Sequence, residues 1–287
     1  MRLKSRRRPN TAAFVSLLLK YHKRGEKTRM QLDKIIAVRN NKTVFSNEGL
    51  CYKVFGASFS KSDVFGEALN QIRAEEAGLF VPKVLEVTDV DGRWAIVSEY
   101  IEGKPLSFLM KENPKKRAEY LELFVDAQLE IQKKSCPFLP TLEERLKSEL
   151  CPEKFSKEVF QKLSSSLERL SKSKSLCHGD YDPSNVIVRD GAATFVIDWA
   201  HAFSGDALFD AAKTYLRFLS DGERKTAEEY LELFCEKSET PKREVEKRLL
   251  IAAASRFVEG NAEERDFLAR EFGFDLKKTE NAKGEEK

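Results

Sequence analysis

The segment from 186 to 197 reads as a β-hairpin, and this hairpin constrains the fold more than any other feature of the chain. The apolar run VIV at 186–188 leads into an Asp190–Gly191 pair, and the run FVI at 195–197 leads out of it. Such runs on both sides of an Asp-Gly pair are typical of two antiparallel strands joined by a tight turn. A polar loop precedes the hairpin, and Pro183 prevents that loop from continuing as a helix.

Side chains suited to chemistry gather at the open end of this hairpin. Residues at equal distances from the turn face each other, so Asn185 and Asp198 are expected to meet, with Asp180 a few residues away. An amide oxygen and a carboxylate suit Mg²⁺, which takes one or two protein oxygens and completes its shell with water and phosphates. A free carboxylate nearby can orient a hydroxyl and accept its proton, and this combination is what phosphate transfer from MgATP requires.

Each of these aspartates has a simpler explanation when it is taken alone. Asp in a loop usually caps a turn, and that explanation fits Asp180, Asp182 and Asp198 one at a time. The set of polar residues, together with the symmetry of the hairpin, favours a site.

Short motifs in this segment resemble the catalytic segment of the aminoglycoside phosphotransferase and choline kinase-like family. They are His178-Gly179-Asp180, Asn185 and Ile197-Asp198-Trp199, followed by Gly205-Asp206 and Asp210. The resemblance covers roughly residues 30–275 and implies an α+β, bilobal protein-kinase-like fold. In that fold a small antiparallel-sheet N-lobe precedes a larger, mainly helical C-lobe that holds the catalytic β-hairpin.

The resemblance also implies a function and roles for these residues. It implies an ATP- and Mg²⁺-dependent phosphotransferase that moves the γ-phosphate of ATP to a hydroxyl of a small molecule, of the aminoglycoside, sugar or amino-alcohol type. Asp180 is then the catalytic residue, and Asn185 and Asp198 hold Mg²⁺. His178 is expected to hold the loop by hydrogen bonds, and Asp210 to support it. Asp182 either faces the substrate or caps the turn.

The first half of the chain fits a nucleotide-binding N-lobe. Strands are expected at 35–39, 43–46, 50–55, 84–88 and 94–99, with a helix from Ser62 to about Gly78. In the family the turn after the first strand covers the nucleotide phosphates and often contains glycine, whereas here it reads RNNK at 39–42. In kinase-like folds the position of Lys53 binds the α- and β-phosphates and pairs with a Glu on the helix. Glu67 is the best-placed partner, and Glu75 is a second candidate.

The segment SEYIEGKPL at 98–106 corresponds to the connection between the lobes. In kinase-like folds main-chain groups of this connection read adenine, so Ser98, Tyr100 and Ile101 are expected to contribute main-chain or packing contacts to the nucleotide. The plain alternative is a strand end. Further helices are expected at 115–134, 141–150, 157–170, 207–219, 225–236, 243–259 and 263–272.

Charge divides the chain unevenly. Residues 1–30 hold ten Lys or Arg and one Glu, a balance of +9, and the other 257 residues hold 40 basic and 46 acidic residues, a balance of −6. We therefore expect a basic N-terminal segment over 1–30 (a short helix or disordered), an N-lobe over 31–99, a C-lobe over 100–276 and a disordered tail over 277–287. The acidic body gives no case for nucleic-acid binding.

Cysteine content and hydropathy bear on the compartment. The five cysteines are odd in number and lack CxxC spacing, which predicts a reducing cytoplasm and argues against structural zinc. The apolar run at 12–19 is too short to span a bilayer, so no transmembrane segment is expected there. Kinase-like sequence begins just after Met30, which is therefore an alternative start.

Two other functions compete with a small-molecule kinase. A protein Ser/Thr kinase would carry Asp-Phe-Gly where this chain has Ile197-Asp198-Trp199, and would follow it with an activation segment. A non-enzymatic pseudokinase would keep the fold and use the basic arm at 1–30 for tethering, but the Lys53, Asp180, Asn185 and Asp198 set is intact. The sequence leaves the acceptor and the choice between ATP and GTP open.

Overall fold

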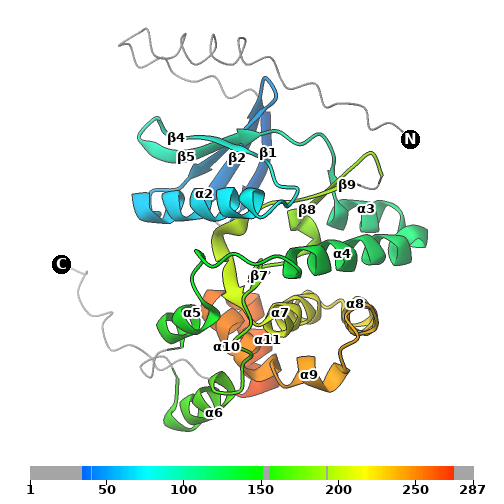
Figure 1. Ribbon diagram of the computed structural model, residues 1–287. Coiled ribbons are helices and arrows are strands. Elements are labelled where there is room, and N and C mark those ends of the chain that lie inside the picture. The colour runs from blue at the N-terminus through cyan, green and yellow to red at the C-terminus, as the bar shows by residue number, and fades with distance from the viewer. Residues whose placement is uncertain (1–33, 40, 151–154, 192, 275–287) are drawn as a thin grey trace, which may run out of the picture.

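The computed structural model of the chain describes residues 34–39, 41–150, 155–191 and 193–274. The helix or disordered segment expected over 1–30 and the tail expected over 277–287 lie outside these residues. The expected α+β, kinase-like architecture is confirmed: a small sheet with one helix lies above a larger, mainly helical part (Figure 1).

The small part is a five-stranded antiparallel sheet in the order β1-β2-β3-β5-β4. Its strands are β1 Lys34–Arg39, β2 Lys42–Asn47, β3 Leu50–Phe55, β4 Val84–Val90 and β5 Arg93–Glu99. The turn between β4 and β5 is the predicted Asp91–Gly92 pair, with φ of 52° and 82°, the two positive values that a tight primed hairpin turn needs. The predicted strands are therefore correct to within a few residues at their ends.

Helix α2, Lys61–Glu76, covers one face of this sheet (Figure 1). Ser60 and Asp63 form a capping box that satisfies free N–H groups at its start. Val64 and Ala68 are buried on the helix side and pack with Phe55 and Ile96 of the sheet. This packing fixes the turn of the helix that carries Glu67, which is also buried.

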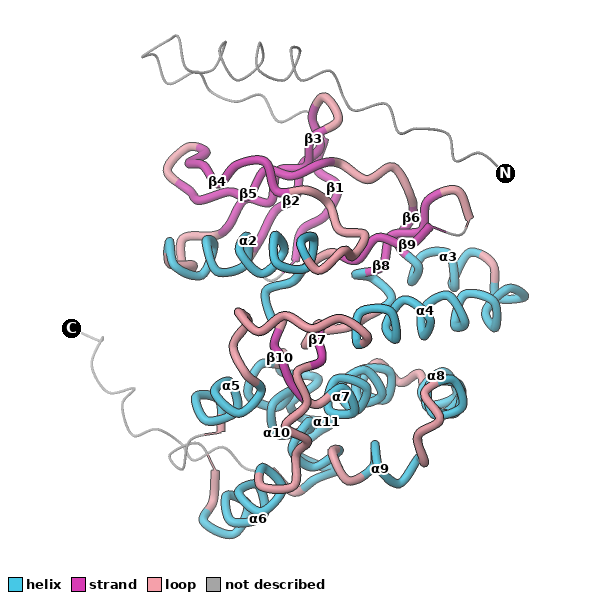
Figure 2. The backbone as a smooth tube through the Cα atoms, in the orientation of Figure 1, coloured by secondary structure: helices cyan, strands magenta, loops and turns pink. Residues whose placement is uncertain are grey.

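A short strand links the small part to the catalytic hairpin. Strand β6, Lys104–Pro105, pairs with β8, Val186–Arg189, which in turn pairs with β9, Ala193–Val196 (Figure 2). At Gly103 a Cβ atom would lie 2.6 Å from the Val188 carbonyl oxygen, so only glycine allows this approach. The sequence predicted the hairpin but not this third strand.

The larger part is built mainly from helices around one hydrophobic core. They are α3 Leu106–Glu112, α4 Arg117–Gln132, α5 Leu142–Glu149, α6 Lys157–Leu167, α7 Ala207–Ser220, α8 Arg224–Lys237, α9 Lys242–Glu246, α10 Leu249–Glu259 and α11 Ala262–Phe272. Strand β7, Ser175–Cys177, pairs with β10, Phe203–Gly205, beneath the hairpin. None of the helices within the described ranges is long and apolar enough to cross a membrane.

The single helix expected over 243–259 is wrong, because the chain breaks it into α9 and α10. In a continuous helix the N–H of Arg248 would donate to the Glu244 carbonyl. Instead the Arg248 guanidinium donates to the Glu244 carbonyl at 2.9 Å and to Asp206 at 3.1 Å. The backbone N–H of Arg248 donates to the Val245 carbonyl. The side chain thus takes the place of the backbone donor.

Candidate active site

A cavity of about 1440 Å³ lies between the small sheet and the larger part. Its lining contains most of the predicted site residues: Lys53, Ser98, Tyr100, Ile101, Asp180, Asn185 and Asp198. Glu67, the eighth, is only 4% exposed and lies behind Lys53. The fold therefore brings side chains from β3, the lobe connection, the loop after β7 and the end of the hairpin to one place.

Two lysines of the small sheet face the hairpin. Lys53 donates to Asp198 Oδ1 at 2.8 Å and is hydrogen-bonded to Glu67 on α2. Lys42, at the start of β2, donates to the other Glu67 oxygen at 2.9 Å and lies 3.9 Å from Asp198 Oδ1. Both lysines project from the same face, since Val44 pairs with Lys53 and lies two residues after Lys42.

These contacts determine the protonation states of Lys53 and Asp198. Burial acts against the ammonium of Lys53, but Asp198 and Glu67 outweigh it, so the pKa of Lys53 lies above its ordinary value. Burial likewise acts against the Asp198 carboxylate, but Lys53 and Lys42 outweigh it and hold the pKa of Asp198 well below its usual range. Both groups are therefore charged at neutral pH. Glu75, the second candidate partner of Lys53, lies instead 3.9 Å from Lys83.

The loop that carries Asp180 is held from two sides. His178, fully buried, donates through Nε2 to the Ile197 carbonyl at 2.9 Å, and its Nδ1 accepts the N–H of Asp180. Asp210, at the start of α7, accepts the N–H groups of His178 and Gly179 at 3.2 and 2.8 Å. Both residues thus hold backbone. Gly179 has φ of 80°, and a Cβ atom there would lie 2.0 Å from a carbonyl oxygen, so glycine is required.

The hairpin register differs from the prediction by one residue. Val186 pairs with Val196, so Asn185 faces Ile197, whose N–H donates to the Asn185 carbonyl at 2.9 Å. The expectation that Asn185 and Asp198 face each other across the hairpin is therefore wrong. The connection spans three residues centred on Gly191, and an odd-numbered connection shifts the register by one. Asp198 follows Ile197 in a left-handed conformation (φ 66°, ψ 64°), and both side chains line the cavity.

The side chains of Asn185 and Asp198 have the donor set of a magnesium site. The amide nitrogen of Asn185 donates to the Asp180 carbonyl at 3.1 Å, so its amide oxygen is the atom that could coordinate an ion. Within the described ranges no three His, Cys, Asp or Glu side chains cluster as a metal site. Magnesium does not need such a cluster, because phosphates and water complete its shell. The residues present therefore fit the ion.

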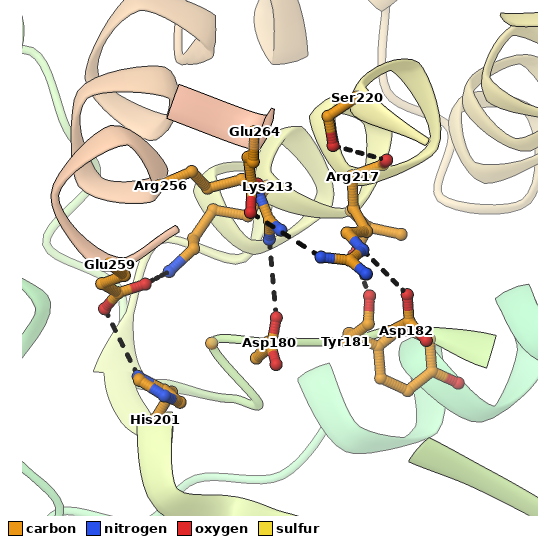
Figure 3. Close-up of polar contacts among 12 residues, drawn as sticks. Asp180, Tyr181, Asp182, His201, Lys213, Arg217, Ser220, Arg256, Glu259 and Glu264 are labelled. Carbon is orange, nitrogen blue, oxygen red and sulfur yellow. Dashed lines mark hydrogen bonds and ion pairs between the residues drawn. The ribbon is translucent and has the colours of Figure 1, made fainter. Parts of the chain in front are cut away.

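Asp180 has a cationic neighbour that the sequence did not predict. Arg256 Nη1, from α10, lies 3.5 Å from Asp180 Oδ1 (Figure 3). Burial acts to raise the pKa of Asp180, but Arg256, His201 and Lys213 outweigh it and lower that pKa below its ordinary value. The Asp180 side chain is 40% exposed, so its carboxylate remains open to the cavity.

Asp182 both caps the turn and faces the cavity. Its carboxylate accepts the N–H of Ser184 at 2.7 Å, which begins the short 3₁₀ turn 183–185. It also lies 3.3 Å from Arg217 of α7. The structure thus confirms that Asp182 caps the turn and places it on the cavity wall, whereas contact with a substrate stays a prediction.

The lobe connection offers fewer free backbone groups than expected. The N–H of Tyr100 donates to the Gly49 carbonyl at 3.0 Å, so this amide is engaged inside the small sheet. Ser98 is buried and paired in β5, and its side chain lines the cavity. Among the described residues, no backbone acceptor takes the N–H of Ile101. Of Ser98, Tyr100 and Ile101, only Ile101 therefore has a backbone N–H that can donate to a ligand.

Among the cavity residues that the sequence analysis did not identify are three cations that lie beside the predicted carboxylates: Lys42, Arg217 and Arg256. For Lys42 a signal existed, since alternation along the strand pair places it on the face of Lys53. Arg217 and Arg256 lie within helical segments that read as packing helices, and nothing in their local pattern indicates that they reach the site. Only the tertiary fold brings them beside Asp180.

Comparison with known proteins places the chain among phosphotransferases. Residues 60–245 match the family model described as the phosphotransferase enzyme family. No curated protein sequence matches the chain.

Solved structures share the fold at low sequence identity. Aminoglycoside phosphotransferase APH(4)-Ia, in a thermostable mutant form, aligns at 16% identity with a TM-score of 0.61, over 84% of this chain and 89% of its own. A choline/ethanolamine kinase family protein from Mesorhizobium loti aligns at 17% identity and a TM-score of 0.58, over 84% and 85%. APH(3'')-Id from Streptomyces rimosus, in complex with ADP and streptomycin, aligns at 18% and 0.59, over 85% and 97%.

Proposed function

The chain belongs to the phosphotransferase enzyme family and is a small-molecule phosphotransferase acting on hydroxyl groups, and from this premise we propose that it moves the γ-phosphate of ATP to its acceptor with Asp180 as the catalytic residue. The observation that carries the proposal is the cavity in which Lys53, Asp198, Asn185 and Asp180 meet. Structures of similar fold that contain ADP or a nucleotide analogue support a nucleotide as donor.

Asp180 accepts the proton of the acceptor hydroxyl in this proposal. Its Oδ1 faces Arg256 at 3.5 Å, which leaves Oδ2 for the hydroxyl. A lowered pKa keeps the carboxylate ionised and able to accept a hydrogen bond. The backbone contacts from His178 and Asp210 hold it in place, and such positioning supplies much of the rate enhancement in phosphate transfer.

The nucleotide lies against the small sheet in this proposal. Lys53, held by Glu67, binds its phosphates, and Lys42 adds a second ammonium where the RNNK turn has no glycine. Ser98, Tyr100 and Ile101 also line the cavity, and in this proposal their packing surfaces and the Ile101 amide receive the base.

Magnesium would be held by the amide oxygen of Asn185 and the carboxylate of Asp198. When bound, the ion offsets the negative charge of the phosphates. The Lys53 ammonium contacts the same carboxylate, at 2.8 Å from Asp198 Oδ1.

The structure favours a small-molecule acceptor over a protein acceptor. Asp198 is followed at once by the 3₁₀ turn Trp199–His201, strand β10 and helix α7. No room is left between them for the activation segment that a protein kinase uses.

We also propose a reducing compartment, the cytoplasm. Cys51, Cys136, Cys177 and Cys235 are free thiols, and Cys136 and Cys177 are buried. Persisting thiols are typical of reducing compartments.

The test is an ATP-consumption screen of the purified protein with Mg²⁺ against hydroxylated metabolites and aminoglycosides. Asp180→Asn should keep nucleotide binding and lower turnover about 10²–10⁴-fold, because it removes the proton acceptor. Asp190→Asn is the matched control, since Asp190 is exposed in the hairpin turn and Asn tolerates its positive φ of 53°. Turnover by Asp180→Asn at the wild-type rate would remove Asp180 from the proposal.

A further inference from the structure

The cavity wall beyond Asp180 carries two guanidinium groups. Arg217 comes from α7 and Arg256 from α10, and both line the cavity together with Glu264 of α11 (Figure 3). Glu264 lies between them, 2.5 Å from Arg256 Nε and 3.7 Å from Arg217 Nη1. Arginines on this wall are unexpected in a pocket for acceptors with several ammonium groups, such as aminoglycosides.

Arg217 is surrounded by carboxylates but is poorly bound by them. Its Nε lies 3.3 Å from Asp182 and 3.1 Å from Asp221, and its Nη1 lies 3.7 Å from Glu264. These are ion pairs by distance, yet within the described part of the chain none has the geometry of a hydrogen bond, and Nε is buried without a hydrogen-bond partner. A buried donor left in this state is uncommon and calls for a partner.

Arg256 is bound on one edge only. Its side chain is 6% exposed, and its Nε donates to Glu264 at 2.5 Å. Nη1 reaches Asp180 at 3.5 Å, the outer limit of a hydrogen bond. A guanidinium has five N–H donors, so over the described residues the two arginines use only a small part of their capacity.

Three carboxylates of the same wall, those of Asp182, Glu259 and Glu264, already accept hydrogen bonds, and a fourth, Asp221, lies 3.1 Å from Arg217 Nε. Asp182 accepts both the N–H and the hydroxyl of Ser184. Glu264 accepts from Arg256, and Glu259 accepts from Lys213 at 2.7 Å and from Arg145 at 2.9 Å. An ammonium group entering here would compete with the lysine and arginine groups that already pair with Glu259, Glu264 and Asp221, whereas an oxyanion would find guanidinium N–H donors that lack a hydrogen-bond acceptor among the described residues.

We propose that Arg217 and Arg256 bind an oxyanion of the acceptor, a carboxylate or a phosphate, beside the hydroxyl that is phosphorylated. A guanidinium binds either group through two parallel N–H···O bonds, which fixes orientation as well as charge. The acceptor is then an anion-bearing hydroxyl compound rather than a polyamine. This inference rests on the proposed function, because it assigns the acceptor end of the same cavity.

The test compares four six-carbon hydroxyl compounds that differ in charge. The protein is first saturated with a non-hydrolysable ATP analogue and Mg²⁺, and this step itself reports on the proposed function. Gluconate, glucose 6-phosphate, glucose and glucosamine are then titrated by calorimetry. Gluconate or glucose 6-phosphate should bind at least tenfold more tightly than the other two, and the better of the pair identifies carboxylate or phosphate.

Variants separate recognition from folding. Arg217→Gln should weaken oxyanion binding about 10- to 100-fold and leave nucleotide binding unchanged, because hydrogen bonds to charged groups are lost only at the acceptor end. Arg217→Lys should retain part of the affinity, and Arg270→Gln, an exposed position on α11, should change nothing. For the buried pair, Arg256→Gln is combined with Glu264→Gln so that the Glu264 carboxylate is not left buried without its donor, and the double variant should weaken oxyanion binding as Arg217→Gln does.

Three results would overturn the proposal while nucleotide binding persists. Glucose or glucosamine could bind as tightly as the oxyanions, no oxyanion could bind, or Arg217→Gln could leave their binding unchanged. Failure of the nucleotide analogue to bind in the first step would instead overturn the proposed function and this inference with it.

Discussion

At the scale of single residues, Lys42 and Lys53 share the carboxylate of Glu67. Lys42 is 13% and Lys53 18% exposed, and both ammonium groups lie within 4 Å of Asp198. The sheet thus presents two cations to a nucleotide where a glycine-containing turn would present backbone amides. In the proposed function, the charge of Lys42 would compensate for the lack of glycine in the RNNK turn.

Lys42→Ala should weaken ATP binding about 10- to 100-fold, since a hydrogen bond to a charged phosphate is lost. Lys53→Ala should weaken it at least as much and also lower turnover, because Asp198 loses its closest cation. Calorimetric titration of each variant with MgATP measures the effect. Lys83→Ala is the control, a small-sheet lysine that is 60% exposed and outside the cavity. Equal ATP affinities in Lys42→Ala and the wild type would contradict the role of Lys42.

At the scale of elements, a charge cluster around the buried Lys213 joins α5, α7 and α10. Glu259 at the end of α10 receives Lys213 of α7 at 2.7 Å and Arg145 of α5 at 2.9 Å, and lies 3.3 Å from His201 (Figure 3). Lys213 is only 2% exposed. Burial acts against the Glu259 carboxylate, but Lys213, His201 and Arg145 outweigh it and hold its pKa well below the usual range.

Glu259→Gln should destabilise the protein by about 3–5 kcal/mol, because a buried lysine loses its partner. A carboxylate whose pKa is lowered on folding contributes stability above its unfolded pKa of about 4.3 and loses it as the pH falls toward the folded value. The free energy of unfolding should therefore fall more steeply below about pH 4.3 in the wild type than in Glu259→Gln. Urea unfolding over a pH series measures both effects.

Glu263→Gln is the matched control for this cluster. It removes an exposed carboxylate in the first turn of α11 and should leave both the stability and its acid slope close to those of the wild type. A Glu259→Gln protein as stable as this control would show that the cluster contributes little.

The elements themselves were largely readable from sequence. Alternation identified the strands around Lys53. The Asp91–Gly92 pair identified the turn between β4 and β5, and the Asp190–Gly191 pair identified the turn of the hairpin. The hairpin register was missed, because local pattern does not specify how many residues the turn spans. The break between α9 and α10 was missed because it depends on Arg248 reaching Asp206, 42 residues away.

The site was readable only where its residues cluster in sequence. Asp180, Asn185 and Asp198 lie within one motif-bearing segment, and Lys53 could be placed by its strand. Arg256 lies 76 positions from Asp180 and sits in the apolar run LLIAAASRFVE, where it looks like an interruption of a core helix. Such contacts arise from tertiary packing, which no local periodicity encodes.

At the scale of the whole molecule, the nucleotide should stabilise the fold because its cavity lies between the sheet and the helical part. A ligand that binds only the folded state at 100 times its Kd adds about 2.7 kcal/mol, so MgATP should raise the melting temperature by several degrees. Asp180→Asn should keep this rise, whereas Lys53→Ala should lose most of it. A thermal melt with and without MgATP gives the result, and an identical rise in both variants would contradict the division of roles.

The short path from Asp198 to α7 makes a prediction about acceptors. With radiolabelled ATP, the wild-type protein should label generic protein substrates no more than the Asp180→Asn variant does, because no activation segment is present to bind a peptide. Labelling of casein or myelin basic protein that depends on Asp180 would favour the protein-kinase alternative instead.

Lys53 bridges Glu67 of helix α2 and Asp198 at the end of the hairpin. Two carboxylates of the protein therefore already bind this ammonium, and a nucleotide phosphate would compete with them for it. The measured affinity for nucleotide would then reflect the contacts that Lys53 gains with phosphate minus those that it loses with Glu67 and Asp198. A variant with a weaker internal bridge, such as Asp198→Asn, is expected to bind nucleotide more tightly in the absence of divalent ions. The same variant is expected to transfer phosphate more slowly, so its higher affinity would come with a lower turnover rate.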